Sequence, residues 1–450
     1  MDTFAGTLKI SASKLGLCAL LLACSLSAQA QTAAAAAAAV VPVKTPAISA
    51  FSSGNTAWLL ICTVLVLLMT VPGIMLFYSG MMRAKNALSV VAHIFAATTM
   101  VTLAWVAVGY SLAFTTGTSL IGDFSRIFSN GLVGSKVGFH PLAPTVPESA
   151  FFLFQMAFAI IAFAIVIGAT VERMRLSATI FFATFWTLLV YAPVAHWVWQ
   201  PSGWLYAMGH MDYAGGTVVH IAAGASGLVA ARFVGPRLGF GKEPMIPNNL
   251  MITVIGAGLL WAGWFGFNAG SAFEASSRAV GAVLATQVAA CVGAFAWGLV
   301  EYVIRGKFSV LGMATGAIAG LVAVTPASGY VDVTGAAIIG TVSGLCCFFA
   351  VTQLKRRTGI DDSLDVFALH GVGGFVGTVL TPVLALSEIA PITATILTNL
   401  TGAVVVMLYA GAMTFVILLI VKPLAGLRVS ADEERIGLDL AQHGETIENS

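Results

Sequence analysis

Long apolar stretches constrain this chain more than any other feature of its sequence. After residue 55 eleven of them follow one another, and each is close to the length of about 20 residues that a helix needs to cross a bilayer. Charged residues make up only 9% of the chain, whereas soluble domains carry roughly 25%. The sequence therefore predicts an all-α polytopic membrane protein with eleven transmembrane helices near 56–78, 87–114, 149–170, 177–197, 213–234, 249–270, 278–303, 309–326, 332–354, 364–386 and 392–421.

The lysines and arginines between these spans predict the orientation of the chain. If alternate loops are cytoplasmic, fifteen lysines and arginines of the mature chain lie on the cytoplasmic side and four lie on the opposite side. Positively charged loops stay in the cytoplasm, so we expect the N-terminus outside and the C-terminus inside. The net charge of +2 gives no reason to expect a nucleic acid partner, and the six cysteines show no disulfide or metal spacing.

The first thirty residues have the plan of a secretory signal peptide. Two lysines precede an apolar core, and Ala28-Gln29-Ala30 resembles a cleavage site. A second possibility is a lipoprotein-type site that would place a lipid on Cys24. Both alternatives leave the mature N-terminus outside. Residues 31–53, which contain an alanine run and two prolines, are expected to form a flexible periplasmic leader.

Two histidines inside apolar spans share one spacing. Asp212 and His220 recur as Asp362 and His370, and glycines follow four and seven residues after each histidine. The histidines fall in the fifth and tenth spans, so the repeat unit is five helices, and an odd-numbered unit inserts with opposite orientation. We therefore expect an inverted 5+5 repeat, residues 54–234 and 249–386, with a long final helix at 392–421 outside it. Such folds place a substrate path between the halves near the midplane.

Several long motifs occur in one order along residues 54–445: GATVERMRLSA from position 168, DYAGGTVVHI from 212, GFGKEPMIPNNL from 239, GWFGFNAGS from 263, GAIAGLVAVTPASGY ending at 330, DDSLDVFALHGVGG from 361 and EERIGLDLAQHGE ending at 445. In these motifs the chain resembles the ammonium transporter, methylammonium permease and Rhesus family, and more closely its bacterial ammonium transporter branch. The resemblance implies a homotrimer in the cytoplasmic (inner) membrane, with one narrow pore in each subunit that moves ammonium or ammonia into the cell.

The resemblance also implies roles for residues along that pore. His220 and His370 match the twin pore histidines, which hydrogen-bond to each other. A neutral imidazole offers one donor and one acceptor, so two in contact can pass a proton. Phe158, in FQMAFA, and Phe267, in GFNAGS, match the stacked phenylalanines that close the outer end. His93 and His196 match no pore role, and we expect them to be structural.

Trp199 and Ser271 match the recruitment site at the outer end, because an aromatic face attracts a cation and a hydroxyl accepts an ammonium N–H. The segment HWVWQPSGWL is one residue longer than the usual family spacing, which leaves Trp197 and Trp204 as alternatives to Trp199. Asp212 is a candidate cation ligand, but its position before AGGTVV favours a helix N-cap, and its cytoplasmic counterpart, at position 362, has the same two interpretations. Secondary candidates near the path lie at Thr325 and Gln155.

Taken together, these residues predict a transporter with no cofactor, taking ammonium and methylammonium as substrates. Ammonium would lose its proton at the gate or at Asp212 and cross as ammonia, with proton co-transfer left open. The tail, residues 428–450, resembles the family's regulatory tail, which cooperates with a PII-type protein, although the usual aromatic residue after HGE is absent. That tail makes an ammonium sensor the alternative function. A metalloenzyme is disfavoured, because no HExxH motif or clustered carboxylate accompanies the histidines.

Overall fold

The computed structural model describes residues 51–134, 137–390 and 393–447, all of which belong to the unit Pro46–Ser450. The predicted signal peptide, the alternative lipidation site at position 24 and leader residues 31–50 lie outside the described residues. The helical domain predicted to begin at residue 54 starts at Ser53, where the side chain of Ser52 accepts the Asn55 backbone N–H and caps the first helix.

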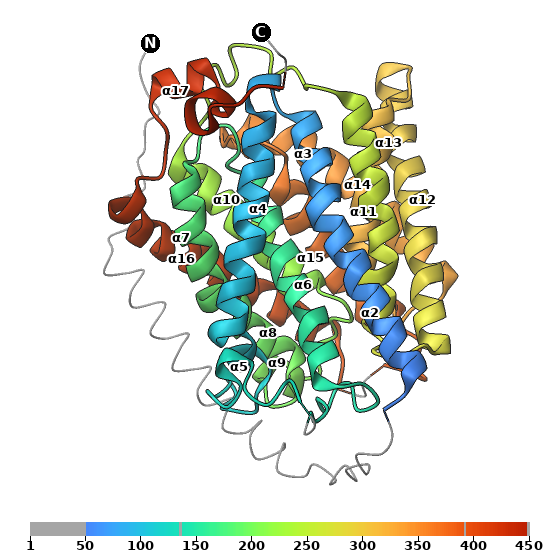
Figure 1. Cartoon of the computed structure of the whole chain (residues 1–450). Coiled ribbons are helices and arrows are strands. Elements are labelled where there is room, and N and C mark those ends of the chain that lie inside the picture. Colours follow the sequence, from blue (N-terminus) through green and yellow to red (C-terminus); the bar gives the residue numbers. More distant parts are fainter. Residues whose placement is uncertain (1–50, 135–136, 391–392, 448–450) are drawn as a thin grey trace, which may run out of the picture. The chain divides into compact units, whose positions relative to one another are not determined.

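All regular secondary-structure elements of the described residues are helices. Besides them there are two isolated β-bridges and no strand in this part of the chain. The all-α prediction is confirmed. Labels with η mark 3₁₀ or π-helical turns. The first half (blue to green in Figure 1) contains α2 (Ser53–Leu68), η1 (Met69–Ile74), α3 (Met75–Met81), η2 (Ala84–Asn86), α4 (Ala87–Ala104), η3 (Trp105–Gly109), α5 (Tyr110–Phe114), η4 (Ile127–Ser129), α6 (Glu148–Ile167), α7 (Leu176–Trp186), η5 (Thr187–Tyr191), α8 (Ala192–Trp199), α9 (Trp204–Ala207), η6 (Gly216–Ile221) and α10 (Ala222–Val234).

The second half of the chain contributes the remaining helices of the bundle. They run from yellow-green to red in Figure 1: α11 (Leu250–Gly270), α12 (Ser277–Arg305), α13 (Val310–Val324), α14 (Val333–Thr358), η7 (Phe367–Gly371), α15 (Val372–Leu384), α16 (Ile396–Ala425), α17 (Ala431–Ile436) and η8 (Asp439–His443).

Ten helices in the described part are long and apolar enough to cross a membrane. The remaining predicted span, the eighth at 309–326, is the shorter apolar helix α13, which has 15 residues. At a rise of about 1.5 Å per residue it covers roughly 22 Å, less than the roughly 30 Å of a hydrocarbon core. It stops before Pro326, after which the chain continues in turns to Tyr330. The structure thus has about ten helices of spanning length and one shorter apolar helix.

Several spanning helices contain a π-helical turn: η1, η3, η5, η6 and η7. In η1 a proline, Pro72, lies inside the helix, where it removes one helical hydrogen bond and crowds the preceding turn. Isolated π-helical turns are frequent at functional sites. Both histidines of the repeat lie on such turns, His220 on η6 and His370 on η7.

A buried ionic network ties together the loops at one end of the bundle. The Glu172 carboxylate accepts hydrogen bonds from Arg83 at 3.0 Å and from Arg237 at 2.8 Å, and Arg237 also binds Asp361 in a bidentate pair at 2.9 and 2.8 Å. Burial alone raises the pKa of Glu172, but the charges of Arg237 and Arg83 outweigh it and hold that pKa below its ordinary value. Buried charges of this kind require partners, and here the partners come from four separate loops.

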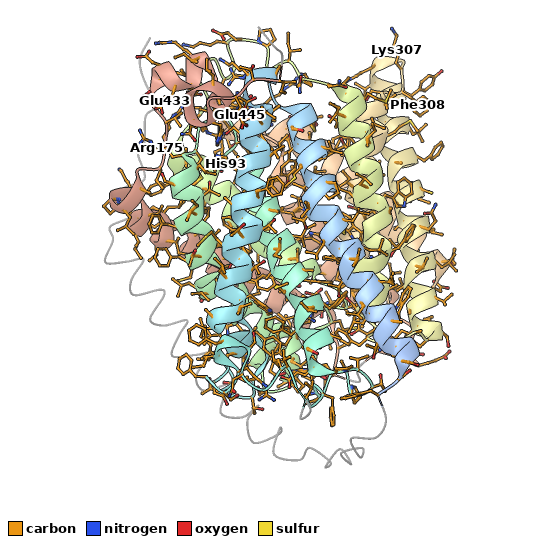
Figure 2. The ribbon with its side chains drawn as sticks, viewed as in Figure 1. His93, Arg175, Lys307, Phe308, Glu433 and Glu445 are labelled. Atoms are coloured by element: carbon orange, nitrogen blue, oxygen red, sulfur yellow. The ribbon has the colours of Figure 1, made fainter. Side chains whose placement is uncertain are left out.

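The C-terminal tail packs against the same end. Glu434, only 1% exposed, accepts hydrogen bonds from the Leu238 backbone N–H and from Arg428. Asp439 caps α4, because its two oxygens accept the backbone N–H groups at positions 88 and 89 at 3.0 and 2.7 Å. Figure 2 shows Arg175 beside Glu433, to which it is paired at 4.0 Å. Residues 430–443 are therefore docked on the protein rather than forming a solvated charged tail.

Candidate functional site

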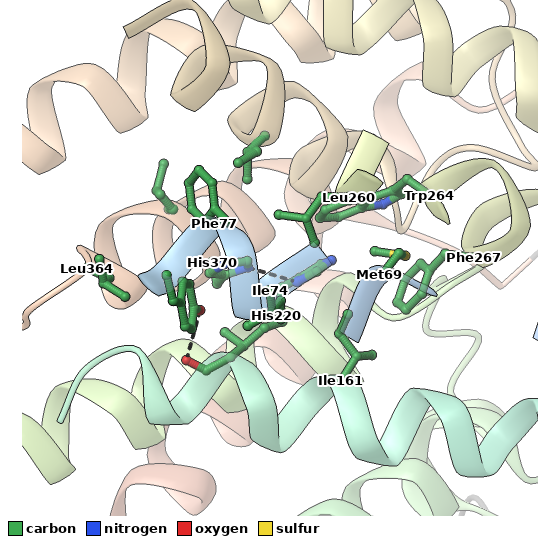
Figure 3. Close-up of a pocket in the computed structure, with 14 residues that line it drawn as sticks. Met69, Ile74, Phe77, Ile161, His220, Leu260, Trp264, Phe267, Leu364 and His370 are labelled. Atoms are coloured by element: carbon green, nitrogen blue, oxygen red, sulfur yellow. Dashed lines mark hydrogen bonds between the residues drawn. The ribbon is translucent and has the colours of Figure 1, made fainter. Parts of the chain in front are cut away.

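The two histidines of the sequence repeat meet inside the bundle. The Nδ1 atoms of His220 and His370 lie 3.1 Å apart, and the rings are inclined by 28° (Figure 3). The residues are 1% and 8% exposed. A hydrogen bond between two Nδ1 atoms requires one ring to carry a proton there and the other to lack one. The second nitrogen of His220, Nε2, is buried without a protein partner among the described residues.

The repeated glycines explain how the histidines approach so closely. A Cβ atom on Gly224 would overlap the backbone of Gly371, and one on Gly374 would crowd the Gly216 carbonyl and the Cβ of His220. The two histidine-bearing segments therefore cross with their backbones in contact, which only glycine permits at these positions. Small residues let membrane helices approach closely in this way.

Asp212 and Asp362 hold their segments differently. The Asp212 carboxylate accepts four backbone N–H groups, from Gly215 and Gly216 at 2.9 and 2.6 Å and from positions 217 and 218 at 3.0 Å each. Asp362 accepts one at 2.8 Å from Phe367, and its Oδ1 has no partner among the described residues. Burial raises the pKa of both carboxyl groups. Asp212 is thus placed as an N-terminal cap, the interpretation that the sequence favoured.

A narrow apolar cavity, here called the inner cavity, surrounds the histidine pair. The space in which the centre of a water molecule can move is about 20 Å³. The residues that line the cavity are Met69, Ile74, Phe77, Tyr78, Ile161, Ile165, His220, Leu260, Trp264, Phe267, Ile318, Leu364, Leu369 and His370. Figure 3 shows the two imidazoles among these apolar side chains. Such a volume holds about one water molecule, so no hydration shell can accompany an ion through it.

Trp264 forms one wall of the inner cavity and contacts the histidine pair. Its ring stacks on His220 with centroids 5.4 Å apart, and its indole N–H donates to the Thr325 hydroxyl at 2.9 Å. Thr325 itself lines no described cavity, so it bears on the path only through Trp264. Trp264 lies within the motif GWFGFNAGS, but nothing in the sequence indicates that it contacts a histidine.

The predicted phenylalanine pair separates the inner cavity from a second, wider one. Phe158 of α6 and Phe267 of α11 stack with centroids 4.1 Å apart at an angle of 11°, and each is 1% exposed. Phe267 lines the inner cavity, whereas Phe158 lines the second cavity. The stacked rings therefore lie between the two cavities.

The second cavity, here called the vestibule, has a volume of about 250 Å³ and a mixed polar and apolar lining. It borders α9, which Figure 1 shows at the end of the bundle opposite α17. Its lining includes Gln155, Phe158, Trp199, Asp212 and Ser271, all predicted from the sequence, and also His210, Tyr213, Arg278 and Tyr330, which were not. His210 and Tyr213 lie on the loop before η6, whereas Arg278 and Tyr330 come from the second half of the chain. Tyr213 and Tyr330 belong to motifs quoted above, but nothing in those motifs marks them as vestibule residues.

The geometry favours Trp199 among the three candidate tryptophans. Trp199 lines the vestibule, packs edge-on against Phe158 at 6.0 Å and donates its indole N–H to the Asp212 backbone carbonyl at 2.8 Å. Trp197 and Trp204 face each other and lie outside the vestibule lining. The Ser271 hydroxyl donates to the Phe267 carbonyl at 3.0 Å, which leaves its lone pairs free to accept.

The histidines expected to be structural have ordinary partners. His93 contacts the Thr179 hydroxyl at 2.7 Å, and His196 contacts two backbone carbonyls at 3.0 and 2.7 Å. Within residues 51–134, 137–390 and 393–447, no three His, Cys, Asp or Glu side chains gather as a metal-binding set.

Comparison with known proteins identifies the family. The chain matches the Ammonium Transporter Family over residues 57–448. It is 43% identical to the ammonium transporter of Aquifex aeolicus over 410 residues (88% of this chain and 94% of that protein) and 43% identical to that of Bacillus subtilis over 403 residues (87% and 98%). These relatives are transporters rather than enzymes.

Solved structures agree with this assignment. Mep2 of Candida albicans superposes with a TM-score of 0.79 at 37% identity, covering 88% of this chain and 90% of that one. The Sensor Amt Protein superposes with a TM-score of 0.80 at 30% identity, covering 87% and 98%. With the family matched over nearly all of its described length, the chain belongs to the Ammonium Transporter Family.

Proposed function

We propose that this protein takes up ammonium across the cytoplasmic membrane and conducts it as ammonia. The observation that carries the proposal is a small apolar cavity that contains a hydrogen-bonded histidine pair and is closed from a polar vestibule by two stacked phenylalanines. The family assignment supports ammonium as the substrate.

Recruitment begins in the vestibule at Trp199 and Ser271. The face of an indole ring attracts a cation by roughly 0.5–2 kcal/mol, depending on desolvation. The Ser271 hydroxyl, which donates to the Phe267 carbonyl, offers its lone pairs to an ammonium N–H. Gln155 adds a carbonyl oxygen, because its Oε1 is buried without a partner among the described residues and the residue lines the same vestibule.

Selectivity follows from the size and polarity of the inner cavity. An ion that enters must leave its water behind, and apart from the two imidazoles the polar groups of the lining, the Tyr78 hydroxyl and the Trp264 indole N–H, are already bonded to other residues. Ammonium and potassium have the same charge and similar size, but only ammonium can leave a proton at the vestibule and continue as a neutral molecule. Charge exclusion therefore separates the two cations, which a simple cation site could not do.

His220 and His370 act as the polar surface that ammonia crosses. The Nδ1 atom of His220 is hydrogen-bonded to His370, whereas its Nε2 atom has no protein partner among the described residues. Each ring thus uses Nδ1 for the other histidine and has Nε2 left for a substrate or a proton. Because one proton is shared between the Nδ1 atoms, a proton arriving on one ring can leave from the other. The pair is therefore a route for proton co-transfer as well as for ammonia.

Current measurements test this route. Ammonium added to membranes that contain the purified protein should evoke a current in the wild type and a smaller one in His220→Ala, while His93→Ala, outside the path, keeps the wild-type current. A wild type that takes up labelled methylammonium without any current would remove the proton relay but leave transport in place. Potassium entry as fast as methylammonium entry would refute the selectivity mechanism.

We also propose the finer topology and assembly: eleven spans in an inverted 5+5 repeat plus a final helix, N-terminus out and C-terminus in, in a homotrimer of the inner membrane. The excess of lysine and arginine on one side supports the orientation. The repeat is supported by the way its two histidine-bearing segments meet: their backbones cross in contact, and His220 is hydrogen-bonded to His370.

A second candidate function is ammonium sensing through a PII-type protein on the cytoplasmic face. The docked tail favours it, because Asp439 joins the tail to the start of α4 and Glu434 joins it to the loop that carries Arg237. One structural neighbour is a Sensor Amt Protein. Deletion of residues 428–450 separates the functions: uptake retained with nitrogen signalling lost supports sensing, whereas loss of both favours a tail that serves transport.

A further inference from the structure

A positive charge lines the vestibule in which a cation is proposed to bind. Arg278, the second residue of α12, is exposed and forms part of the vestibule wall. Its guanidinium carbon lies 5.0 Å from the centre of the Tyr213 ring and 4.9 Å from that of Tyr330. Its Nε donates to the Gly329 carbonyl at 3.0 Å. The side chain therefore contacts two rings and a carbonyl although part of it remains exposed.

No ion pair neutralises this charge among the described residues. Among the described residues, no carboxylate lies within 4.0 Å of the guanidinium of Arg278. The one carboxylate in the vestibule lining, Asp212, is held by four backbone N–H groups and does not pair with Arg278, and Glu274 near the Tyr213 ring does not pair with it either. Cation–π contacts and a carbonyl stabilise a guanidinium without neutralising it. An unpaired guanidinium consequently lies at the wall of the space that Trp199 and Ser271 also line, and its charge adds a repulsive contribution for any cation there.

The two tyrosines are themselves fixed. Their rings meet edge to face with centroids 5.6 Å apart, and the Tyr213 backbone N–H donates to the Pro326 carbonyl at 3.0 Å. The Tyr213 ring covers Gly329 so closely that a Cβ atom there would overlap it. The charge of Arg278 is thus held at one position relative to the vestibule, which a free surface arginine would not be.

We propose that Arg278 is a specificity-determining residue that lowers the affinity of the vestibule for cations, and for divalent cations more than for ammonium. The proposal rests on cation recruitment in the vestibule. Coulomb repulsion is proportional to the charge of the approaching ion, so a divalent ion is disfavoured by about the square of the factor that applies to a monovalent one. The arginine therefore filters competing ions at the cost of some ammonium affinity.

Two substitutions test the charge separately from the packing. Arg278→Gln removes the charge, and Arg278→Lys keeps it. For two charges about 10 Å apart at an effective dielectric constant of roughly 40 to 80, removing one changes binding about two- to fourfold. In proteoliposomes at low ionic strength, Arg278→Gln should lower the KM for labelled methylammonium by that factor with unchanged Vmax. Arg278→Lys should keep the wild-type KM.

Salt and divalent ions provide further readouts. The difference in KM between Arg278→Gln and wild type should shrink in about 1 M salt, where the screening length is near 3 Å. With methylammonium well below its KM, the concentration of Mg²⁺ that halves uptake should fall in Arg278→Gln by about the square of the KM factor. Arg305→Gln, at the other end of the same helix and 60% exposed, is the matched control and should change neither quantity.

Distinct results overturn the inference and the proposed function. An unchanged KM in Arg278→Gln at low salt, or an equal rise of KM in the Gln and Lys variants, would show that Arg278 only packs the tyrosines. In that case a raised KM in Trp199→Ala would leave recruitment intact. Wild-type vesicles that take up no methylammonium would overturn both proposals.

Discussion

Replacing Asp212 by asparagine should destabilise the protein far more than it weakens substrate binding. The wild-type carboxylate satisfies four buried backbone N–H groups, two on each oxygen. Asparagine keeps one oxygen, but its amide group would point two further donors at the N–H groups of positions 217 and 218. Those two backbone donors would lose their acceptor and face another donor instead.

The size of the effect follows from these bonds. A buried donor left without a partner costs roughly 1–3 kcal/mol, so two of them cost about 2–6 kcal/mol. With an unfolding entropy of roughly 2.1 cal/mol/K per residue over about 400 residues, that loss lowers the Tm by about 2–7 °C. Asp362→Asn is the matched comparison, because Asp362 accepts one bond from Phe367 and its Oδ1 has no partner among the described residues. The asparagine oxygen can keep the bond from Phe367, so no backbone N–H loses its acceptor and the Tm should fall by less than in Asp212→Asn.

Thermal unfolding of the detergent-solubilised variants, followed by tryptophan fluorescence, measures the two shifts, and vesicle uptake measures the KM. We expect Asp212→Asn to unfold clearly earlier than Asp362→Asn. Equal Tm values for the two variants would refute the capping argument. An unchanged Tm together with a raised KM in Asp212→Asn would show that the carboxylate binds the cation directly.

Three further outcomes can be checked. Thr325→Val leaves the buried Trp264 indole N–H without its acceptor, so both the Tm and the uptake rate should fall, whereas Thr325→Ser keeps both. Asp439→Asn weakens the cap that ties the tail to α4, so trypsin should cleave after Arg435 faster than in the wild type, without change in the cleavage pattern elsewhere. The pKa of Glu172 is held below its ordinary value, so its ion pairs stabilise the fold above about pH 4.3 and are lost as the pH falls through the lower pKa of the folded state. Below about pH 4.3 the Tm of the wild type should therefore drop more steeply than the Tm of Glu172→Gln. Parallel curves of Tm against pH would contradict this.

The helical membrane fold was predictable because it depends on local composition. Apolar stretches of about twenty residues can satisfy their backbone groups in a bilayer only as helices, whatever their neighbours are. The one span that differs, α13, shows where this reasoning stops. Its sequence is apolar through residue 326, yet the helix ends at Val324, because Pro326 lacks a backbone N–H and the chain turns there.

Parts of the candidate site were predictable for a different reason. Asp212 and His220 recur with identical spacing, and intramembrane acids and histidines are rare enough that a match carries information. Phe158 and Phe267 could be singled out only through the motifs that resemble the family, since phenylalanine is common in this chain, with 28 residues. Their stacking at 4.1 Å could not be deduced from either motif.

The sequence alone determined that the chain spans a membrane and that two similar segments each carry one aspartate and one histidine, because hydropathy and spacing are properties of adjacent residues. Only the tertiary structure decided which atoms meet: the Nδ1 atoms of His220 and His370, the indole of Trp199 in place of Trp197 or Trp204 at the vestibule, and the charge of Arg278 between two tyrosines. The physical reason is that helix crossings fix side-chain direction. These crossings depend on backbone contacts at glycines far apart in the chain.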